Sequence, residues 1–262
     1  MMVGRRETGG RSTGADDRGL SEVLGFALVF ALVVSTVLLV SLIGFGALEE
    51  TRDAEELNNA ERAFDVLADN MADIHEGGAP SRATEISLQT AQLQVGDPIM
   101  MNVTAINESG GSEVNQYPID PIVFESGDSE VVYAGGATFR TQGEGGLMIA
   151  EPPLVNESDN LLLPIVQTRH RGDITSTSGQ TVRVRAVNQQ RRPVPGFSED
   201  PTSHQSIIIN VTSPRAGLWE TYFSDRQEMS CVTPRENNLR CTIDDPESVF
   251  LTRTLIIYEF ET

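Results

Sequence analysis

Lysine is absent from this chain of 262 residues, and histidine and cysteine are scarce. All 19 basic side chains are arginine, and 38 acidic side chains bring the formal net charge to −19. A surface with this charge repels a phosphate backbone, so nucleic acid is excluded as a partner class.

The three histidines, His75, His170 and His204, belong to no metal-binding or nucleophile-activating pattern. His170 stands between Arg169 and Arg171, which predicts a surface turn. We therefore expect no catalytic residue, no metal and no cofactor. A carboxylate pair of the glycosidase type leaves no sequence signature, so a surface enzyme stays open as an alternative.

One long apolar run interrupts this polar composition. From Leu24 to Leu48 the chain carries no charge, and as a helix, at about 1.5 Å per residue, the run is long enough to cross a hydrocarbon layer of about 30 Å. A cleaved secretory signal has a shorter apolar core followed by a small-residue cleavage site, and this run fits neither feature. We predict a transmembrane helix over residues 20–48, surrounded by membrane lipid.

The charges on either side of this run predict its orientation. Arginine resists translocation and collects on the cytoplasmic side of a membrane. Arginines are more frequent before the run than after it: Arg5, Arg6, Arg11 and Arg18 precede it, and Arg52 and Arg62 follow it among acidic residues. We expect a single-pass protein of the cell membrane with a cytoplasmic N-terminus and an extracellular remainder.

Residues 49–76 have the pattern of an amphipathic helix. Apolar side chains recur at alternating spacings of three and four, at Leu57, Ala60, Phe64, Leu67, Met71 and Ile74. Such a stripe forms a coiled-coil interface with another chain or packs against its own domain, and over so few turns we favour the second. The helix is predicted to end within residues 75–80, which include two glycines and a proline.

Residues 80–262 have the composition of a strand-rich domain, with short β-branched stretches broken by Gly, Pro, Asn and Asp. The expected strands are Glu85–Val95, Ile99–Ile106, Ile119–Glu125, Glu130–Tyr133, Ala137–Thr141, Leu161–Thr168, Thr181–Asn188, Gln205–Thr212 and Thr252–Glu261. The glycine-rich stretches 135–136 and 143–146 are predicted to lie in hairpin turns. The fold class is therefore α+β: a long N-terminal transmembrane and amphipathic helix, then a mostly antiparallel, sandwich-like β domain.

One helix is expected inside the β domain. Ser213 can cap it and Pro214 can take its first position. The aromatic residues that follow, together with a leucine, share one helical face, which we interpret as core packing over a sheet: Leu218, Trp219, Tyr222 and Phe223.

Cys231 and Cys241 are the only cysteines, and both fall in the presumed external part. An oxidising exterior permits a disulfide between them, which we predict. Their separation is not a metal-ligand spacing, and no histidine nearby completes a zinc site.

Four Asn-x-Ser/Thr sequons offer acceptors for N-glycosylation if this region is external. They begin at Asn102, Asn107, Asn156 and Asn210. Asn102 and Asn210 fall on expected strands, so Asn107 and Asn156 are the better candidates.

The start of the chain resembles a known family. The order Arg18-Gly19-Leu20-Ser21-Glu22-Val23, in which a basic residue, a small residue and a polar turn open into a long apolar helix, is similar to the class III signal of archaeal type IV pilin-like proteins. In that family a prepilin peptidase cuts on the cytoplasmic side, and the apolar helix stays on the mature protein. The resemblance implies a leader of residues 1–19, a cut between Gly19 and Leu20, and the peptidase and other pilin-like subunits as partners.

The resemblance covers about the first fifty-five residues, and it has one departure. A glutamate early in many pilin helices meets the amino terminus of a neighbouring subunit and sets the register. Here Glu22 would be only the third mature residue. It is therefore either this register residue or an acid stabilised by a helix N-terminus.

The acidic, lysine-free composition is similar to that of proteins from salt-loving archaea, in which salt screens self-repulsion. High-GC codon bias combined with an acidic surface is the other explanation. We predict a membrane-anchored archaeal pilin-like protein of the cell surface with a structural or adhesive role. The alternative is an uncleaved single-pass membrane protein whose external domain binds a ligand.

Overall fold

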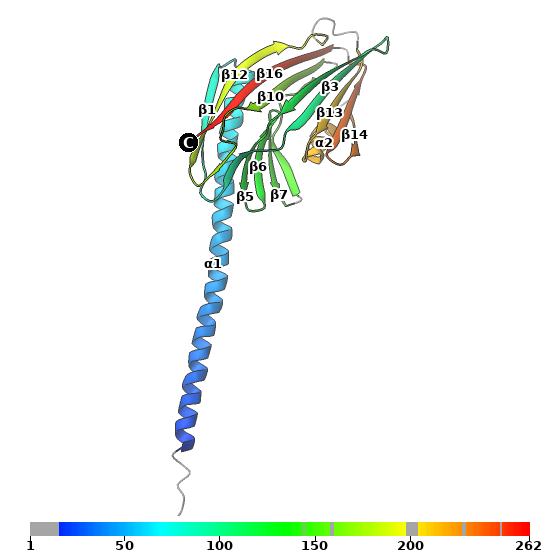
Figure 1. Ribbon diagram of the computed structural model, residues 1–262. Helices are drawn as coiled ribbons and strands as arrows, with labels where there is room; N and C mark the ends of the chain where they lie inside the picture. The colour runs from blue at the N-terminus through cyan, green and yellow to red at the C-terminus, as the bar shows by residue number, and fades with distance from the viewer. Residues whose placement is uncertain (1–15, 144, 158–159, 198–203, 227–228, 247) are drawn as a thin grey trace, which may run out of the picture. The chain divides into compact units, whose positions relative to one another are not determined.

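Figure 1 shows the computed structural model of the chain. The backbone is described for residues 16–143, 145–157, 160–197, 204–226, 229–246 and 248–262, and the side chains for the same residues except 16–21, 44–51, 53, 155–157, 160 and 204. The chain divides into two compact units, residues 1–52 and residues 53–262.

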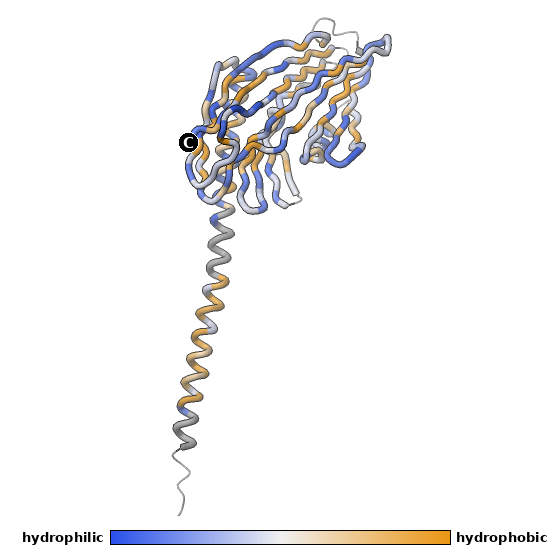
Figure 2. Tube along the Cα trace, in the orientation of Figure 1, coloured by the Kyte–Doolittle hydropathy of each residue, from blue (hydrophilic) through white to orange (hydrophobic). Residues whose placement is uncertain are grey.

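A single helix, α1 (Asp16–His75), contains both helical segments expected from the sequence. It begins four residues before the predicted start at Leu20, and it ends at His75, within the range 75–80 where its end was predicted. Residues 22–43 form an almost uniformly apolar stretch, which is orange in Figure 2.

The second unit contains three β-sheets. Sheet A has the strand order β1-β12-β16-β10-β9, with β1 (Ser81–Ser87), β9 (Val155–Glu157), β10 (Asn160–His170), β12 (Thr181–Pro193) and β16 (Ser248–Glu261). Sheet B has the order β11-β2-β5-β6-β7-β8, with β2 (Gln92–Val95), β5 (Ile122–Ser126), β6 (Ser129–Ala134), β7 (Ala137–Gln142), β8 (Gly145–Ala150) and β11 (Ser176–Ser178). Sheet C has the order β14-β15-β13-β3-β4, with β3 (Ile99–Asn107), β4 (Ser112–Ile119), β13 (His204–Thr212), β14 (Met229–Arg235) and β15 (Asn238–Asp244).

The predicted α+β class and the mostly antiparallel pairing are confirmed. Among the described strands, β10 and β16 are the one parallel pair. The sequence predicted a sandwich-like domain, which has two sheets, whereas the structure has three. Sheet B contributes residues to two separate hydrophobic cores.

Strand β6 shows how sheet B serves both cores. Val131 and Tyr133 pack in a core with the C-terminal part of α1, whereas Val132 and Ala134 pack in a core with α2 (Ala216–Ser224) and sheet C. Side chains alternate between the two faces of a strand, so a strand buried on both faces is apolar at every position.

Helix α2 packs its aromatic side chains into the core, as predicted. Trp219 is fully buried, with ring-centroid distances of 5.3 Å to Phe139 and 5.8 Å to Phe223. The helix begins at Ala216 and not at the expected Ser213–Pro214, and Ser213 instead accepts a hydrogen bond at Oγ from the Arg215 backbone N–H, at 3.1 Å.

One local prediction is wrong, and another is correct in part. The expected strand Glu85–Val95 is two strands, β1 and β2, in different sheets. The turn expected over residues 143–146 is confirmed in part: Gly143, with a positive φ of +55°, follows β7 in the β7–β8 hairpin, whereas Gly145 and Gly146 belong to strand β8. The turn at Gly135 and Gly136 is confirmed: both have positive φ, +64° and +89°, and they join β6 to β7.

Candidate functional site

The first candidate site is the apolar segment Glu22–Ile43. It is long and apolar enough to cross a membrane, and none of it is buried within the protein. The segment is compatible with a single-pass membrane anchor, and a signal sequence near an N-terminus has the same length and composition.

The proposed processing position lies in the first turns of α1. Gly19 and Leu20 have helical backbone, and their side chains lie outside the described residues. Glu22, the candidate register residue, has an exposed side chain.

The second candidate site is the amphipathic end of α1, where the predicted stripe meets the β domain. All six stripe residues are buried, with exposed fractions from 0% to 5%. They share one hydrophobic core with residues of sheets A and B, among them Ile86, Phe124 and Tyr258. The interpretation that this stripe packs against its own domain is confirmed.

A buried carboxylate fixes the beginning of this stripe. Glu56 is 2% exposed, and its Oε1 accepts hydrogen bonds from the backbone N–H groups of Gln89, Thr90 and Ala91 at 3.0, 2.9 and 3.1 Å. Its Oε2 accepts a bond of 2.6 Å from the Thr90 hydroxyl. Burial alone would raise the pKa of this carboxyl, but the four hydrogen bonds outweigh burial and lower the pKa.

This contact explains why Glu85–Val95 is not one strand. The backbone N–H groups of residues 89–91 point at the Glu56 carboxylate and are therefore not available to a neighbouring strand. Sequence reasoning missed Glu56 because nothing in a chain with 38 acidic residues marks one of them as buried.

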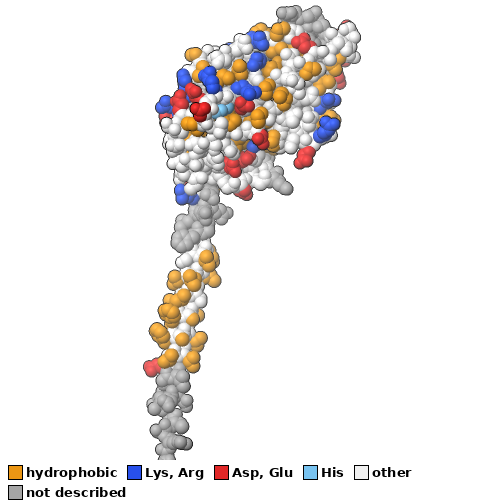
Figure 3. Space-filling view, viewed as in Figure 1, with side chains coloured by type: hydrophobic (Ala, Val, Ile, Leu, Met, Phe, Trp, Pro, Cys, Tyr) orange, Lys and Arg blue, Asp and Glu red, His pale blue; other side chains and the backbone are white. Residues whose placement is uncertain are grey.

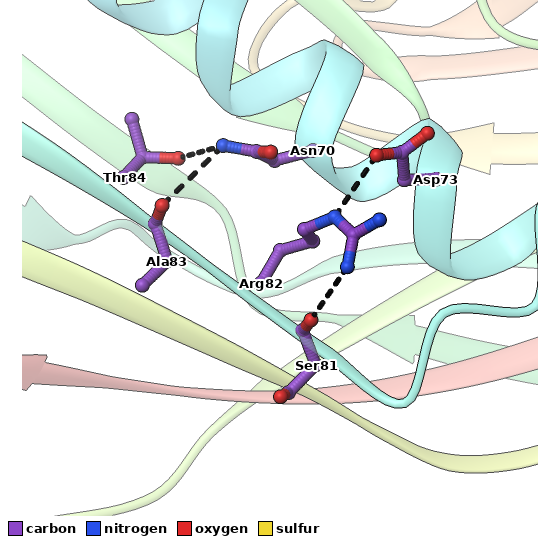
Figure 4. Close-up of polar contacts among 6 residues, drawn as sticks. All are labelled: Asn70, Asp73, Ser81, Arg82, Ala83 and Thr84. Carbon is purple, nitrogen blue, oxygen red and sulfur yellow. Dashed lines mark hydrogen bonds and ion pairs between the residues drawn. The ribbon is translucent and has the colours of Figure 1, made fainter.

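Polar contacts also join the last turns of α1 to strand β1 (Figure 4). The Asn70 side-chain amide donates to the Thr84 hydroxyl at 2.9 Å and to the Ala83 carbonyl at 3.4 Å. Arg82 Nε donates to the Asp73 carboxylate at 2.9 Å. These contacts are partly exposed, so they contribute little to the stability of the fold and mainly set the position of helix α1 on strand β1.

His75 is the last residue of helix α1. It is 7% exposed, and its Nδ1 has no hydrogen-bond partner. Burial, with a smaller contribution from the positive charge of Arg191, lowers the pKa of His75 from 6.5 to about 4. The histidine is therefore neutral in the folded protein near pH 7.

The other two histidines lie apart from His75. The prediction that His170 lies in a surface turn is wrong: it is the last residue of β10, and its ring packs edge-on against Tyr258 at 5.3 Å. His204 begins β13, and its side chain lies outside the described residues. Within the described part of the chain, no three His, Cys, Asp or Glu side chains are grouped to hold a metal ion.

Cys231 and Cys241 are joined by a disulfide. They are directly opposite one another on β14 and β15, so the bond crosses a hairpin at the edge of sheet C. A cross-link over so short a loop stabilises this local hairpin more than it constrains the whole domain.

The two favoured glycosylation sequons lie in different surroundings. Asn107 is exposed at the end of β3, and its Oδ1 accepts hydrogen bonds from Ser109 Oγ at 2.8 Å and from the Gly111 backbone at 2.7 Å. Asn156 pairs with Leu161 through its backbone, and its side chain lies outside the described residues.

Together, the fold and these sites define a protein in which the described residues contain one candidate membrane helix. The amphipathic end of this helix is built into the core of a disulfide-containing β domain. The chain belongs to the DUF7289 family, a family of unknown function, whose model matches residues 18–258. No curated protein and no solved structure matches the chain.

Proposed function

We propose that this chain is a pilin-like protein of the cell surface, anchored by α1 in the membrane and carrying residues 53–262 outside the cell. The observation that carries this proposal is the uncovered apolar segment Glu22–Ile43. An apolar surface of this extent is unfavourable in water, whereas a helix that is apolar all round is stable in lipid. Its role is structural or adhesive.

Three further observations support the orientation and the processing step. Arginines are concentrated before the apolar segment, which favours a cytoplasmic N-terminus. The disulfide of Cys231 and Cys241 fits an oxidising exterior. The family match begins at Arg18, next to Gly19 and Leu20, so the leader proposed from the resemblance lies almost entirely outside the shared region.

The mature N-terminus tests the processing step. Mass spectrometry of protein purified from its own cells should show a chain that begins at Leu20. Gly19→Val places a branched side chain beside the proposed cut and should leave residues 1–19 attached. Gly25→Val is the matched control, because a Cβ at Gly25 meets no atom within 4 Å, and it should be cleaved normally.

An intact N-terminus in the wild-type protein would contradict processing and favour the uncleaved single-pass alternative. The orientation is tested separately with an epitope tag after Thr262, which is exposed. An antibody should bind the tag on intact cells. Binding only after lysis would contradict the external placement of the β domain.

A further inference from the structure

Sheet A carries a concentration of arginine that is unusual for a chain of net charge −19. Strands β10, β12 and β16 together hold Arg169, Arg183, Arg185, Arg191, Arg192 and Arg253. Basic side chains gather over β12 and β16 in Figure 3. Sheet A is therefore a locally basic surface on an acidic protein.

Some of these arginines are neutralised by carboxylates. Arg169 pairs with Asp120 at 3.1 Å, Arg183 with Glu261 at 3.4 Å, and Arg185 with Glu259 at 2.8 Å. By contrast, Arg192 and Arg253 form no ion pair with any residue of the described chain.

Arg192 and Arg253 are direct cross-strand partners. The irregularity between Asn188 and Gln190 in β12 shifts the register by one residue and places Arg192 opposite Arg253. Directly opposite residues of an antiparallel pair point to the same face, and like charges in this position repel one another. The fold thus places two positive charges side by side, and no carboxylate of the described residues forms an ion pair with either of them.

Arg253 is held in place by a chain of hydrogen bonds. Its Nε donates to Gln167 Oε1 at 2.7 Å, and Gln167 Nε2 donates to the Pro118 carbonyl at 2.7 Å. Gln167 is 4% exposed, so this support is rigid. Because Nε is occupied, the two terminal nitrogens of the Arg253 guanidinium are left to bind a ligand.

A third donor, the hydroxyl of Tyr117, is near enough to the two arginines for their charges to act on it. The Tyr117 side chain is 4% exposed, and its hydroxyl is buried without a hydrogen-bond partner. Burial raises the pKa of Tyr117 to about 12, although the charges of Arg253 and Arg192 act in the opposite direction, so the hydroxyl keeps its proton. The nearby carboxylate of Glu113 acts on Tyr117 but forms no ion pair of 4 Å or less with either arginine.

We propose that Arg192, Arg253 and Tyr117 form a binding site for one oxyanion of the carboxylate or sulfate class. Two guanidinium groups supply charge and paired N–H donors, which match the geometry of these anions, and the tyrosine hydroxyl supplies one more donor. A bound anion would remove the repulsion between the arginines and satisfy the unpaired hydroxyl. The proposal goes beyond the proposed function and does not depend on it.

Thermal unfolding of the full-length protein in detergent tests this site, with the fluorescence of the single, fully buried Trp219 as the signal. Sodium sulfate and sodium acetate are the probes, and sodium chloride at equal ionic strength is the reference. A probe at tenfold excess over its Kd should raise the Tm of the wild type by about 3–6 °C relative to chloride.

Sulfate also stabilises folded proteins without binding a site, so the variants decide the result. Arg192→Gln should lose this specific increment, whereas Arg183→Gln, with the same change of charge on the same strand, should keep it. Glu113→Gln should increase it, because a competing negative charge is removed. In chloride, Arg192→Gln should have a higher Tm than the wild type, since it removes the opposed charge.

Arg253 is half-buried, and Arg253→Gln carries the risk of misfolding; the exposed Arg192 therefore bears the main test. The response to acetate relative to sulfate identifies the preferred oxyanion. Equal increments in the wild type, Arg192→Gln and Arg183→Gln with both probes would overturn the proposal.

Discussion

Two stretches of helix α1 are both rich in apolar residues, yet they have opposite exposure. In residues 22–43 Phe30 is 59% exposed, whereas in residues 57–74 Phe64 is 0% exposed. The first stretch is apolar on all sides, and the second is apolar only along a stripe. An all-round apolar helix requires an apolar solvent, while a striped helix requires one apolar partner, which here is the β domain.

The pattern of apolar residues, more than their number, therefore distinguishes a candidate membrane anchor from a core element. The stripe is covered because every third or fourth side chain meets sheets A and B. The polar positions between the stripe residues stay in contact with water or form ion pairs, such as Glu61 with Arg140 at 2.7 Å.

The largest expected effect comes from truncating one phenylalanine in each stretch. Phe64→Ala should lower the free energy of unfolding of the β domain by about 3–5 kcal/mol, because it removes a fully buried ring and leaves a cavity. Phe30→Ala should leave this free energy unchanged. Urea unfolding followed by Trp219 fluorescence measures both, and equal effects of the two substitutions would contradict the division of α1 into a candidate anchor and a core segment.

The second largest effect is expected from acid, which should destabilise the buried end of helix α1 at His75. The folded pKa of His75 is lowered from 6.5 to about 4, so the unfolded chain binds a proton first as the pH falls. Stability is unaffected above pH 6.5, decreases as the pH falls from 6.5 to about 4, and is then lower by about 3 kcal/mol from this residue. Urea unfolding across this range should show a loss that is reduced in His75→Gln, and an unchanged pH profile in that variant would refute the assignment.

The elements with the clearest hydrophobic pattern could be predicted from the sequence. The α1 stripe, the hairpin turn at Gly135 and Gly136, and the aromatic face of α2 all follow from local periodicity or turn chemistry. Most of the strands that sequence reasoning missed are edge strands, namely β4, β8, β9, β11 and β14. An edge strand exposes much of its surface, so it lacks the alternation that marks a half-buried strand.

Strand β15 was also missed, although its sequence carries the alternation of apolar and polar residues that marks a half-buried strand. Leu239, Cys241 and Ile243 alternate with exposed or half-buried residues, and all three are buried. The pairing of Arg192 with Arg253, in contrast, could not be predicted. It depends on a one-residue irregularity in β12, and register between distant strands is set by the assembled sheet.

The smallest of these effects is expected at Glu56, where the stripe begins. Glu56→Gln replaces a carboxylate that accepts four hydrogen bonds with an amide that carries its own donors, and it should cost about 1.5–3 kcal/mol at pH 7. Glu55→Gln, at the exposed neighbouring position, is the matched control and should have almost no effect.

The pH dependence at Glu56 has a defined sign. Because its pKa is lowered in the folded protein, the wild type has the full contribution above the ordinary glutamate pKa of 4.5 and loses it as the pH falls through the folded value. The difference between wild type and Glu56→Gln in urea unfolding should therefore shrink in acid. If the difference is the same at pH 7 and in acid, or if Glu55→Gln is equally destabilised, the carboxylate does not fix the start of the buried helix.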